Sequence, residues 1–500
     1  MQTIMKRAIL TAIISAAAIV TAAAQTRTAY FMEGTTFRTQ FNPALAPTQG
    51  YFNIPVLGGI NVNVDGTLCL NDLLRPNPNG SGLVTILSSA ISSADALSGL
   101  NKGLNSFNTD MNVNILGFGA YTKNRKNFWS FGLNIHTEAA IDIPYSFFDF
   151  AKNISGGTNR YDFSQMQAMV NAYADIGFSY SLPVTDKLYV GARAKFLVGL
   201  GYANMQIDRM NLQLDDTAWR GNAMASMNIY MNGLTTDDTL KNMELGFKGP
   251  AGYGFGIDVG ATYDVMDNLQ VSLAVNDIGF MSWGKSAVTR FETDENGIDF
   301  RGMDVVIDGN GSAGSDAGDL LSFDDFNLHK VNMGGKGATT SLRATINAGV
   351  EYELENRWVS FGLLYHARMG HYKSSHNLTA AVNFQPCYWF TLTPSYTFNN
   401  NSSGAVGLAL NLCPSWINFF IATDMLLSKH TREWIPYKQD RMTFTLGLGV
   451  PMGKRGYRNE KYNSQFQQRE QQKADNRAAR KAAKSSGKSN SAAGIKVSAK

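Results

Sequence analysis

Three histidines, His366, His371 and His376, are the first residues in this sequence whose type and spacing could support chemistry. Imidazole nitrogens are common zinc ligands. A step of five residues, however, places successive side chains on neither one helix face nor one strand face, and no carboxylate lies among them. We expect exposed loop histidines and no metal site. The serines, aspartates and histidines elsewhere show no catalytic spacing, so we predict no catalytic residues, no cofactor and no enzymatic activity.

Charged side chains alternate with apolar ones at several positions. They are Asp175, Arg193, Lys195, Asp258, Arg343 and Glu351. In a strand, alternate residues face the same side, so each of these charges shares a face opposite an apolar row. We expect them to line a polar interior, mainly as ion pairs, with contact to a ligand as the alternative. The surrounding strands must hold them there.

Residues 117–136 show the alternating pattern expected of the strands that hold these charges. Trp129, Phe131, Leu133 and Ile135 alternate with polar or small residues, as in a half-buried strand. We predict strands of this kind at 52–64, 111–122, 128–137, 173–182, 188–200, 252–265, 268–277, 341–354, 357–367, 377–385, 388–398, 404–412, 416–424 and 441–450.

The connections between these strands alternate in length. Short turns follow every second strand, whereas the long segments 65–110, 138–172, 201–251 and 278–340 follow the others. Short periplasmic turns, long outer loops and an even strand count are typical of outer-membrane β-barrels. Aromatic residues such as Tyr121, Trp358 and Trp389 gather near the short turns, as in an interfacial girdle. We therefore predict an all-β fold, a single fourteen-stranded antiparallel transmembrane barrel with its apolar faces in lipid.

Both ends of the chain differ from this body. Residues 1–24 have a basic start, a short apolar run and an Ala-x-Ala site, which predict a secretory signal peptide. Residues 454–500 carry 13 basic and 3 acidic residues without an apolar stripe, which predicts a disordered or helical tail. We assign 51–453 to the barrel. The tail would be periplasmic and would bind peptidoglycan or another anionic envelope component, not nucleic acid.

Two segments resemble a known family. "TQFNPALAPTQGYFNIPVLGGINVNVDG" (Thr39–Gly66) contains Asn42, Pro43 and Ala44 before the first strand, and "GFGIDVGATYDVMDNLQVSLAVNDIGFMSW" (Gly254–Trp283) contains a Gly-rich strand pair. Both resemble FadL-like outer-membrane barrels, and more closely the PorV-like and PorP-like barrels of type IX secretion. The resemblance implies a hatch in or under the lumen, which we place at residues 25–50.

The resemblance leaves two functions open. The first is a conduit for a small hydrophobic molecule across the bacterial outer membrane. The second is a non-transporting component or anchor of a secretion or surface-protein complex. The partners expected are outer-membrane lipid and, for the first function, the hydrophobic molecule. Leucines at helical spacing also predict a short helix within Thr85–Asn105.

Two cysteines near the short turns suggest a covalent link. If the hairpin between strands 388–398 and 404–412 is symmetric about Asn400, Cys387 and Cys413 face each other. Opposite residues in an antiparallel pair have Cα atoms about 4.5–5.5 Å apart, which is within disulfide range. Reduced, buried thiols are the alternative.

Overall fold

The computed structural model describes residues 27–456 and residue 475, apart from gaps at 69, 81, 154–158, 215–218, 237–242, 294–297, 304–328, 332–336, 356–357, 370–373, 400–403, 415 and 425–441. The predicted signal peptide and nearly all of the predicted tail lie outside the described residues. Those two predictions therefore stay predictions.

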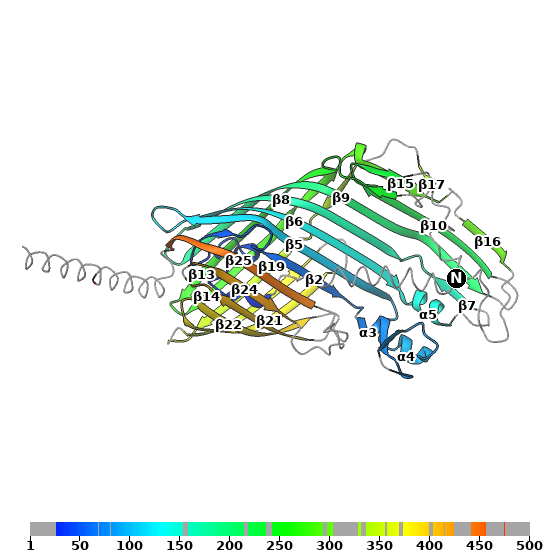
Figure 1. Cartoon of the computed structure of the whole chain (residues 1–500), viewed down its shortest axis with the longest axis horizontal. Helices are drawn as coiled ribbons and strands as arrows, with labels where there is room; N and C mark the ends of the chain where they lie inside the picture. Colours follow the sequence, from blue (N-terminus) through cyan, green and yellow to red (C-terminus); the bar gives the residue numbers. More distant parts are fainter. Residues whose placement is uncertain are drawn as a thin grey trace, which may run out of the picture.

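Fourteen antiparallel strands form a closed barrel, as predicted (Figure 1). The first strand has two parts, β1 (Gln49–Asn53) and β2 (Ile60–Gly66), and so does the eighth, β18 (Ala338–Ser341) and β19 (Thr345–Glu353). The others are β5 (Leu104–Tyr121), β6 (Phe128–Pro144), β8 (Gln167–Pro183), β9 (Leu188–Leu214), β13 (Gly252–Met266), β14 (Leu269–Trp283), β20 (Val359–Arg368), β21 (Ser375–Cys387), β22 (Phe390–Asn399), β23 (Ala405–Leu412), β24 (Asn418–Thr423) and β25 (Met442–Arg455).

The first strand closes the barrel by pairing with both the second and the last. Phe52 lies opposite Phe118 of β5 and Val450 of β25, and Ile60 lies opposite Val113 and Leu446. Closure removes the sheet edges, so the backbone groups of the wall are paired within it. The last strand runs two residues beyond Gly453, the predicted end of the barrel.

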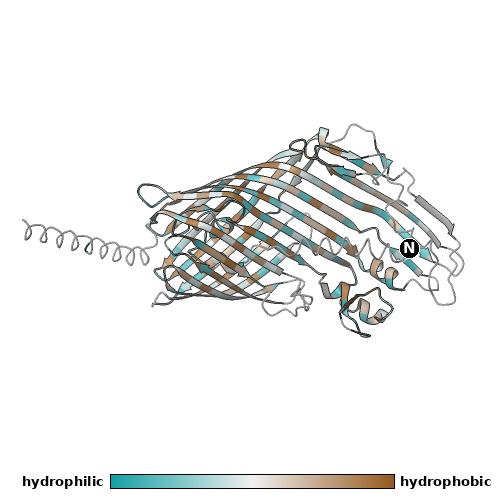
Figure 2. Cartoon of the chain, in the orientation of Figure 1, coloured by the Kyte–Doolittle hydropathy of each residue, from teal (hydrophilic) through white to brown (hydrophobic). Residues whose placement is uncertain are grey.

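The outer face of the wall is apolar, as the alternation predicted. Phe178, Phe196, Phe255 and Leu273 are each about half exposed, whereas the intervening Asp175, Ser179, Lys195 and Asp258 are buried inside. Figure 2 shows the corresponding alternation of hydrophobic and hydrophilic residues along the strands. An exposed apolar band on a closed barrel is the feature that places such a wall in lipid. None of the helices in the described ranges is long and apolar enough to cross a membrane.

One end of the barrel carries the short connections, including 122–127, 184–187, 267–268 and 388–389. We call it the tight-turn end. Exposed aromatics lie near it, among them Tyr263, Trp358 and Trp389. Tyr121 is an exception to the predicted girdle, because its hydroxyl donates to the Pro47 carbonyl, inside the barrel.

The opposite end bears a large β-extension in place of the long outer loops that we expected (Figure 1). β9 continues to Leu214, and its outer half pairs with β10 (Trp219–Tyr230). β10 in turn pairs with β15 (Val288–Glu292) and β16 (Ile298–Met303), while β7 (Asn159–Asp162) pairs with β9 and β17 (His329–Lys330) with β15. Two small hairpins, β3 (Leu74–Pro76) with β4 (Leu83–Thr85) and β11 (Leu234–Thr236) with β12 (Met243–Leu245), complete the strands.

Short helices cover part of this end. They are α3 (Leu70–Leu73), α4 (Ser93–Leu97), α5 (Tyr145–Asn153) and η2 (Lys285–Ala287). α4 is the helix predicted within Thr85–Asn105, but it is only five residues long. The Ser92 hydroxyl caps its first turn by accepting from the Asp95 amide, and Gly99 follows its end. Leu97 packs with Ile91, Leu100 and Phe148 in a buried cluster.

Candidate functional site: the plugged lumen

A segment before the first strand fills part of the lumen. We call residues 27–48 the plug. It contains η1 (Arg27–Phe31) and α2 (Arg38–Phe41), and almost all of its residues are buried. Its apolar side chains pack against the inner wall in one cluster, consisting of Ala29, Tyr30, Phe31, Met32, Phe37, Phe41, Leu45, Leu364, Ala381, Ala409, Phe420 and Ala422. This burial removes apolar surface from the water of the lumen, which favours the docked position.

Glycines of the wall make room for the plug. A Cβ on Gly191 would lie 2.3 Å from the Pro43 carbonyl carbon, and one on Gly260 would lie 2.1 Å from Asn42 Oδ1. Similarly, a Cβ on Gly362 would lie 2.4 Å from the Phe31 ring. Any larger residue at these positions would therefore push the plug inward.

The Asn42-Pro43-Ala44 motif makes polar contacts at this docking site. Asn42 is fully buried; its Oδ1 accepts from the Ala44 amide at 2.9 Å, and its Nδ2 donates to the carbonyl of Ala261 at 3.3 Å. The preceding carbonyl, of Phe41, accepts from Asn276 Nδ2 at 2.7 Å and Asn347 Nδ2 at 2.9 Å. The motif is thus tied to several strands at once.

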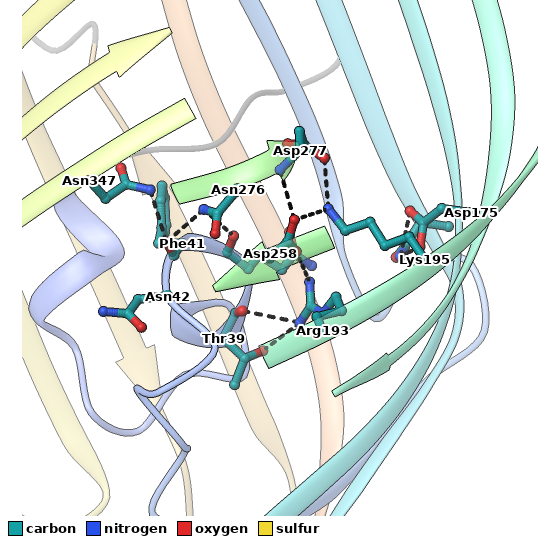
Figure 3. A network of polar contacts seen from close by, with 12 residues as sticks. Thr39, Phe41, Asn42, Asp175, Arg193, Lys195, Asp258, Asn276, Asp277 and Asn347 are labelled. Atoms are coloured by element: carbon teal, nitrogen blue, oxygen red, sulfur yellow. Dashed lines mark hydrogen bonds and ion pairs between the residues drawn. The ribbon is translucent and has the colours of Figure 1, made fainter. Parts of the chain in front are cut away.

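Beside the motif, four charged residues from three strands form a buried network (Figure 3). Lys195 Nζ on β9 lies 2.8 Å from Asp258 Oδ1 on β13 and 2.7 Å from Asp277 Oδ1 on β14. Arg193 Nη1 lies 3.7 Å from Asp258 Oδ2, and its Nη2 donates to the Thr39 carbonyl of the plug at 3.1 Å. The network therefore links wall and plug.

A β-bulge creates this network. The register between β13 and β14 shifts so that Asp258 faces both Asn276 and Asp277. Asp277 has a φ of 60°, and its amide donates to Asp258 Oδ1 at 2.8 Å. The bulge brings Asn276 and Asp277 to the same cavity. We did not predict Asp277; the available signal was the Asn276-Asp277 pair, which interrupts the alternation of its strand.

The other predicted charges occupy three places. Asp175 contacts His136 Nε2 and accepts from Asn134 Nδ2 at 3.1 Å. Arg343 Nη1 donates to Glu138 Oε1 at 2.7 Å, beside an Arg368–Asp110 pair at 2.5 Å.

Glu351 lies apart from both groups and accepts from the Ser360 hydroxyl at 2.8 Å. Four of the six predicted charges thus line the cavities described next, Asp258 contacts Lys195 and Arg193 there, and Glu351 lines neither cavity.

Two adjacent cavities lie between plug and wall. The smaller is lined by Asp175, Arg193, Lys195 and Asp277, together with Phe41 of the plug; we call it the plug cavity. The larger is lined by Arg27, Arg343, Arg368 and many asparagines; we call it the arginine cavity. Both share Asn112, His136, Asp277 and Thr345. The lumen at this level is polar and charged.

Other chemistry is not supported by the geometry. The described residues contain no group of three or more His, Cys, Asp or Glu side chains that could hold a metal ion. Gly279–Ser286 has the spacing Gly-x-x-x-x-Gly-Lys-Ser of a phosphate-binding loop. It runs along β14 as far as Trp283 and reaches η2, so its backbone is mostly extended and cannot wrap a phosphate.

The predicted disulfide is not formed. Cys387 and Cys413 are both free thiols. Phe390 of β22 lies opposite Leu412 of β23, so the hairpin is centred on residue 401 rather than on Asn400. The Cys413 amide consequently donates to the Trp389 carbonyl, and Cys387 ends the neighbouring strand β21.

The fold and the site together define a membrane-spanning β-barrel with an internal plug and a charged lumen. A family model described as "Family of unknown function (DUF5723)" matches residues 43–424, and the chain belongs to that family. No curated protein matches the chain.

Several solved structures of transport channels are similar to this chain. The toluene transporter TbuX of Ralstonia pickettii is 11% identical, with 86% of this chain and 97% of that chain covered and a TM-score of 0.38. A FadL homologue of Pseudomonas aeruginosa is 11% identical, with 86% and 99% covered and a TM-score of 0.38. The toluene transporter TodX of Pseudomonas putida is 10% identical, with 86% and 93% covered and a TM-score of 0.34.

Proposed function

We propose that this protein is an outer-membrane conduit for a small hydrophobic molecule, and that the molecule leaves the barrel through its wall. The plug and the charged networks obstruct a straight path for such a molecule. Apolar solutes are not stabilised among paired charges and buried amides. A lateral path into the lipid avoids this polar region.

The observation that carries the proposal is a break in the first strand. Between β1 and β2, residues 54–59 leave the regular ladder, and Val56 adopts a φ of 67°. Ile54 N donates to Leu448 O of β25, but Leu448 N donates to the carbonyl of Leu57 rather than to that of Ile54. Val56 and Leu57 form an exposed apolar loop at this point.

The neighbouring strand is irregular at the same level. The β2–β5 ladder ends where Asn114 N donates to the Gly59 carbonyl, and the β1–β5 ladder resumes at Asn53 opposite Gly117. β5 also has a bulge between Asn114 and Leu116. This part of the wall therefore has fewer ladder hydrogen bonds to break than a regular strand pair.

A reversible lock tests the proposal. Ile54 and Leu448 face each other, so Ile54→Cys with Leu448→Cys should form a disulfide that holds β1 against β25. The control pair is Val350→Cys with Leu363→Cys, which are opposite residues of the regular β19–β20 ladder. Toluene uptake is measured in cells that lack their own hydrophobic-uptake barrel.

We expect expression of the protein to increase toluene uptake. Oxidation of the first pair should return uptake to background and a reductant should restore it, while the control pair should have no effect. Uptake equal to that of cells without the barrel overturns the proposal and favours a non-transporting anchor. Uptake that the lock leaves unchanged overturns the lateral path.

A further inference from the structure

The arginine cavity collects polar atoms that have no hydrogen-bond partner among the described residues. They are Arg27 Nε and Nη1, Asn61 Nδ2, Asn63 Oδ1, Asn112 Oδ1, Asn171 Oδ1 and Arg343 Nε. The side chains of Arg27, Asn61, Asn63 and Asn171 are all more than nine-tenths buried. Buried polar groups in proteins are nearly always paired, with protein, water or ligand. Their convergence on one cavity therefore indicates an occupant.

The asparagines are held in place by their other ends. Asn63 Nδ2 donates to Asp110 Oδ2 at 2.9 Å, and Asn61 Oδ1 accepts from the Thr445 hydroxyl at 3.0 Å. Each side chain is thus oriented by the wall, while its second polar atom has no hydrogen-bond partner among the described residues. Such fixed, single-ended amides are suited to hydrogen bonds with hydroxyl groups.

The charges of the lining leave Arg27 as the cation available for a ligand. Arg368 is paired with Asp110, Arg343 with Glu138, and Asp277 with Lys195. Asp424 lies near enough to interact electrostatically with Arg27, but it accepts instead from the Thr28 and Thr443 hydroxyls. No ion pair within 4 Å joins Arg27 to any acid of the described ranges.

We propose that the arginine cavity binds a small hydroxylated organic acid, with its carboxylate on Arg27. A guanidinium binds a carboxylate through charge-assisted hydrogen bonds. The hydroxyl groups of such a ligand donate to Asn63, Asn112 and Asn171 and accept from Asn61 and Arg343 Nε.

This site is separate from the proposed hydrophobic path. Its ligand would bridge the plug, which supplies Arg27, to strands β2, β5 and β8 of the wall, which supply the asparagines. Binding would therefore hold the plug in its docked position.

D-glucuronate is the probe, and D-glucose is its match without the carboxylate. Binding is measured by calorimetry on the purified full-length barrel in detergent. We expect saturable glucuronate binding that is at least about tenfold tighter than glucose binding, because the loss of one charge-assisted contact is of that order. Equal binding of the two sugars, or no binding of either, shows a merely hydrated cavity and overturns the proposal.

Two variants locate the site. Arg27→Gln should weaken glucuronate binding about tenfold or more. Arg38→Gln is the matched control, since Arg38 is an equally buried plug arginine that donates to the Tyr30 carbonyl and lines neither cavity. Equal loss in both variants means that the plug was disturbed, and no loss in Arg27→Gln means that the anion binds elsewhere; either result contradicts the site.

A third variant separates binding from folding. Asn171→Ala removes one hydroxyl acceptor without touching a charge. It should weaken glucuronate binding and leave acetate binding unchanged, whereas a parallel change in both anions contradicts the proposed contacts.

Discussion

Asp258 lies directly opposite Arg193 in the ladder between β13 and β9, yet its closest cation is Lys195, at 2.8 Å against 3.7 Å for Arg193. The bulge at Asn276 and Asp277 accounts for the position of Lys195, because it brings a second carboxylate, that of Asp277, to the Lys195 ammonium group. Arg193 is then free to bind the Thr39 carbonyl. One irregularity in the wall thus joins the plug to the ion network.

Asp258→Asn should destabilise the barrel. The substitution removes one charge from a buried network, and breaking such a pair typically costs about 3–5 kcal/mol. We expect a lower free energy of unfolding in urea titrations of the barrel in lipid vesicles. Arg290→Gln, which breaks the exposed Arg290–Glu292 pair, should cost less than about 1 kcal/mol. Equal losses would show that the lumen network is fully hydrated.

Phe178→Lys tests the lipid-facing side of the wall. Phe178 is 52% exposed on β8, and a lysine near the middle of a bilayer costs about 2–4 kcal/mol. We expect a smaller folded fraction by heat-modifiable gel migration after insertion into vesicles. Phe178→Leu loses the ring but keeps the apolar contact, so it should insert normally. Normal insertion of the lysine variant would place this face in water.

Gly191→Ala should displace the plug. Its Cβ would meet three atoms of the Pro43–Ala44 backbone within 2.5 Å, and overpacking costs about 1–3 kcal/mol. We expect faster proteolysis of the plug and larger conductance in planar bilayers. Gly132→Ala is the control, because the nearest atom to its Cβ would be 3.6 Å away. Identical conductance in the two variants would mean that the plug is not seated on Gly191.

Thiol labelling reports on the two cysteines. Burial raises the pKa of Cys413 to about 11, so at pH 8 only about one molecule in a thousand carries the reactive thiolate. We expect slow alkylation of Cys413 in the folded barrel that accelerates as the pH rises toward 11. In urea without reductant, Cys387 and Cys413 should both be alkylated within minutes. Resistance of both until a reductant is added would restore the disulfide.

The basic tail is proposed to tether the barrel to the cell wall. The tail deletion should start after Gly456, because Arg455 still belongs to β25 and lies over the Tyr388 ring. Deleting residues 457–500 should leave the barrel folded and weaken its sedimentation with isolated peptidoglycan. Added salt should have the same effect on the intact protein, since exposed charges are screened over about 10 Å at 0.1 M salt. Salt-independent sedimentation would contradict the tether.

Alternation and turn lengths were sufficient to predict the barrel strands and their inward and outward faces. They could not predict the β-extension, because β9 beyond Gly201 pairs with β10 and β7, and its Ile207, Met210 and Leu212 pack in a local apolar cluster rather than alternating between lipid and lumen. Leu197 shows the same effect at its base; it faces inward but packs with Met281, Trp283 and Leu342.

The details of the site required the register between strands. The alternating pattern indicates that Arg193, Lys195 and Asp258 face the lumen, but not that a bulge adds Asp277. The two-residue error in the partner of Cys413 has the same origin, since a loop length alone does not fix where pairing begins. The fit between wall glycines and the plug depends on a chain path that no local pattern encodes.

The 27 residues of β9 exceed the roughly 10 residues that a tilted strand needs to cross a bilayer. At about 3.3 Å per residue, well over half of its length projects beyond the lipid. This projecting part packs with its neighbours around an apolar core that includes Phe150, Phe163, Ile207 and Phe291. Its packing therefore does not depend on contact with the bilayer. The end of β9 at Leu214 therefore lies well clear of the headgroups.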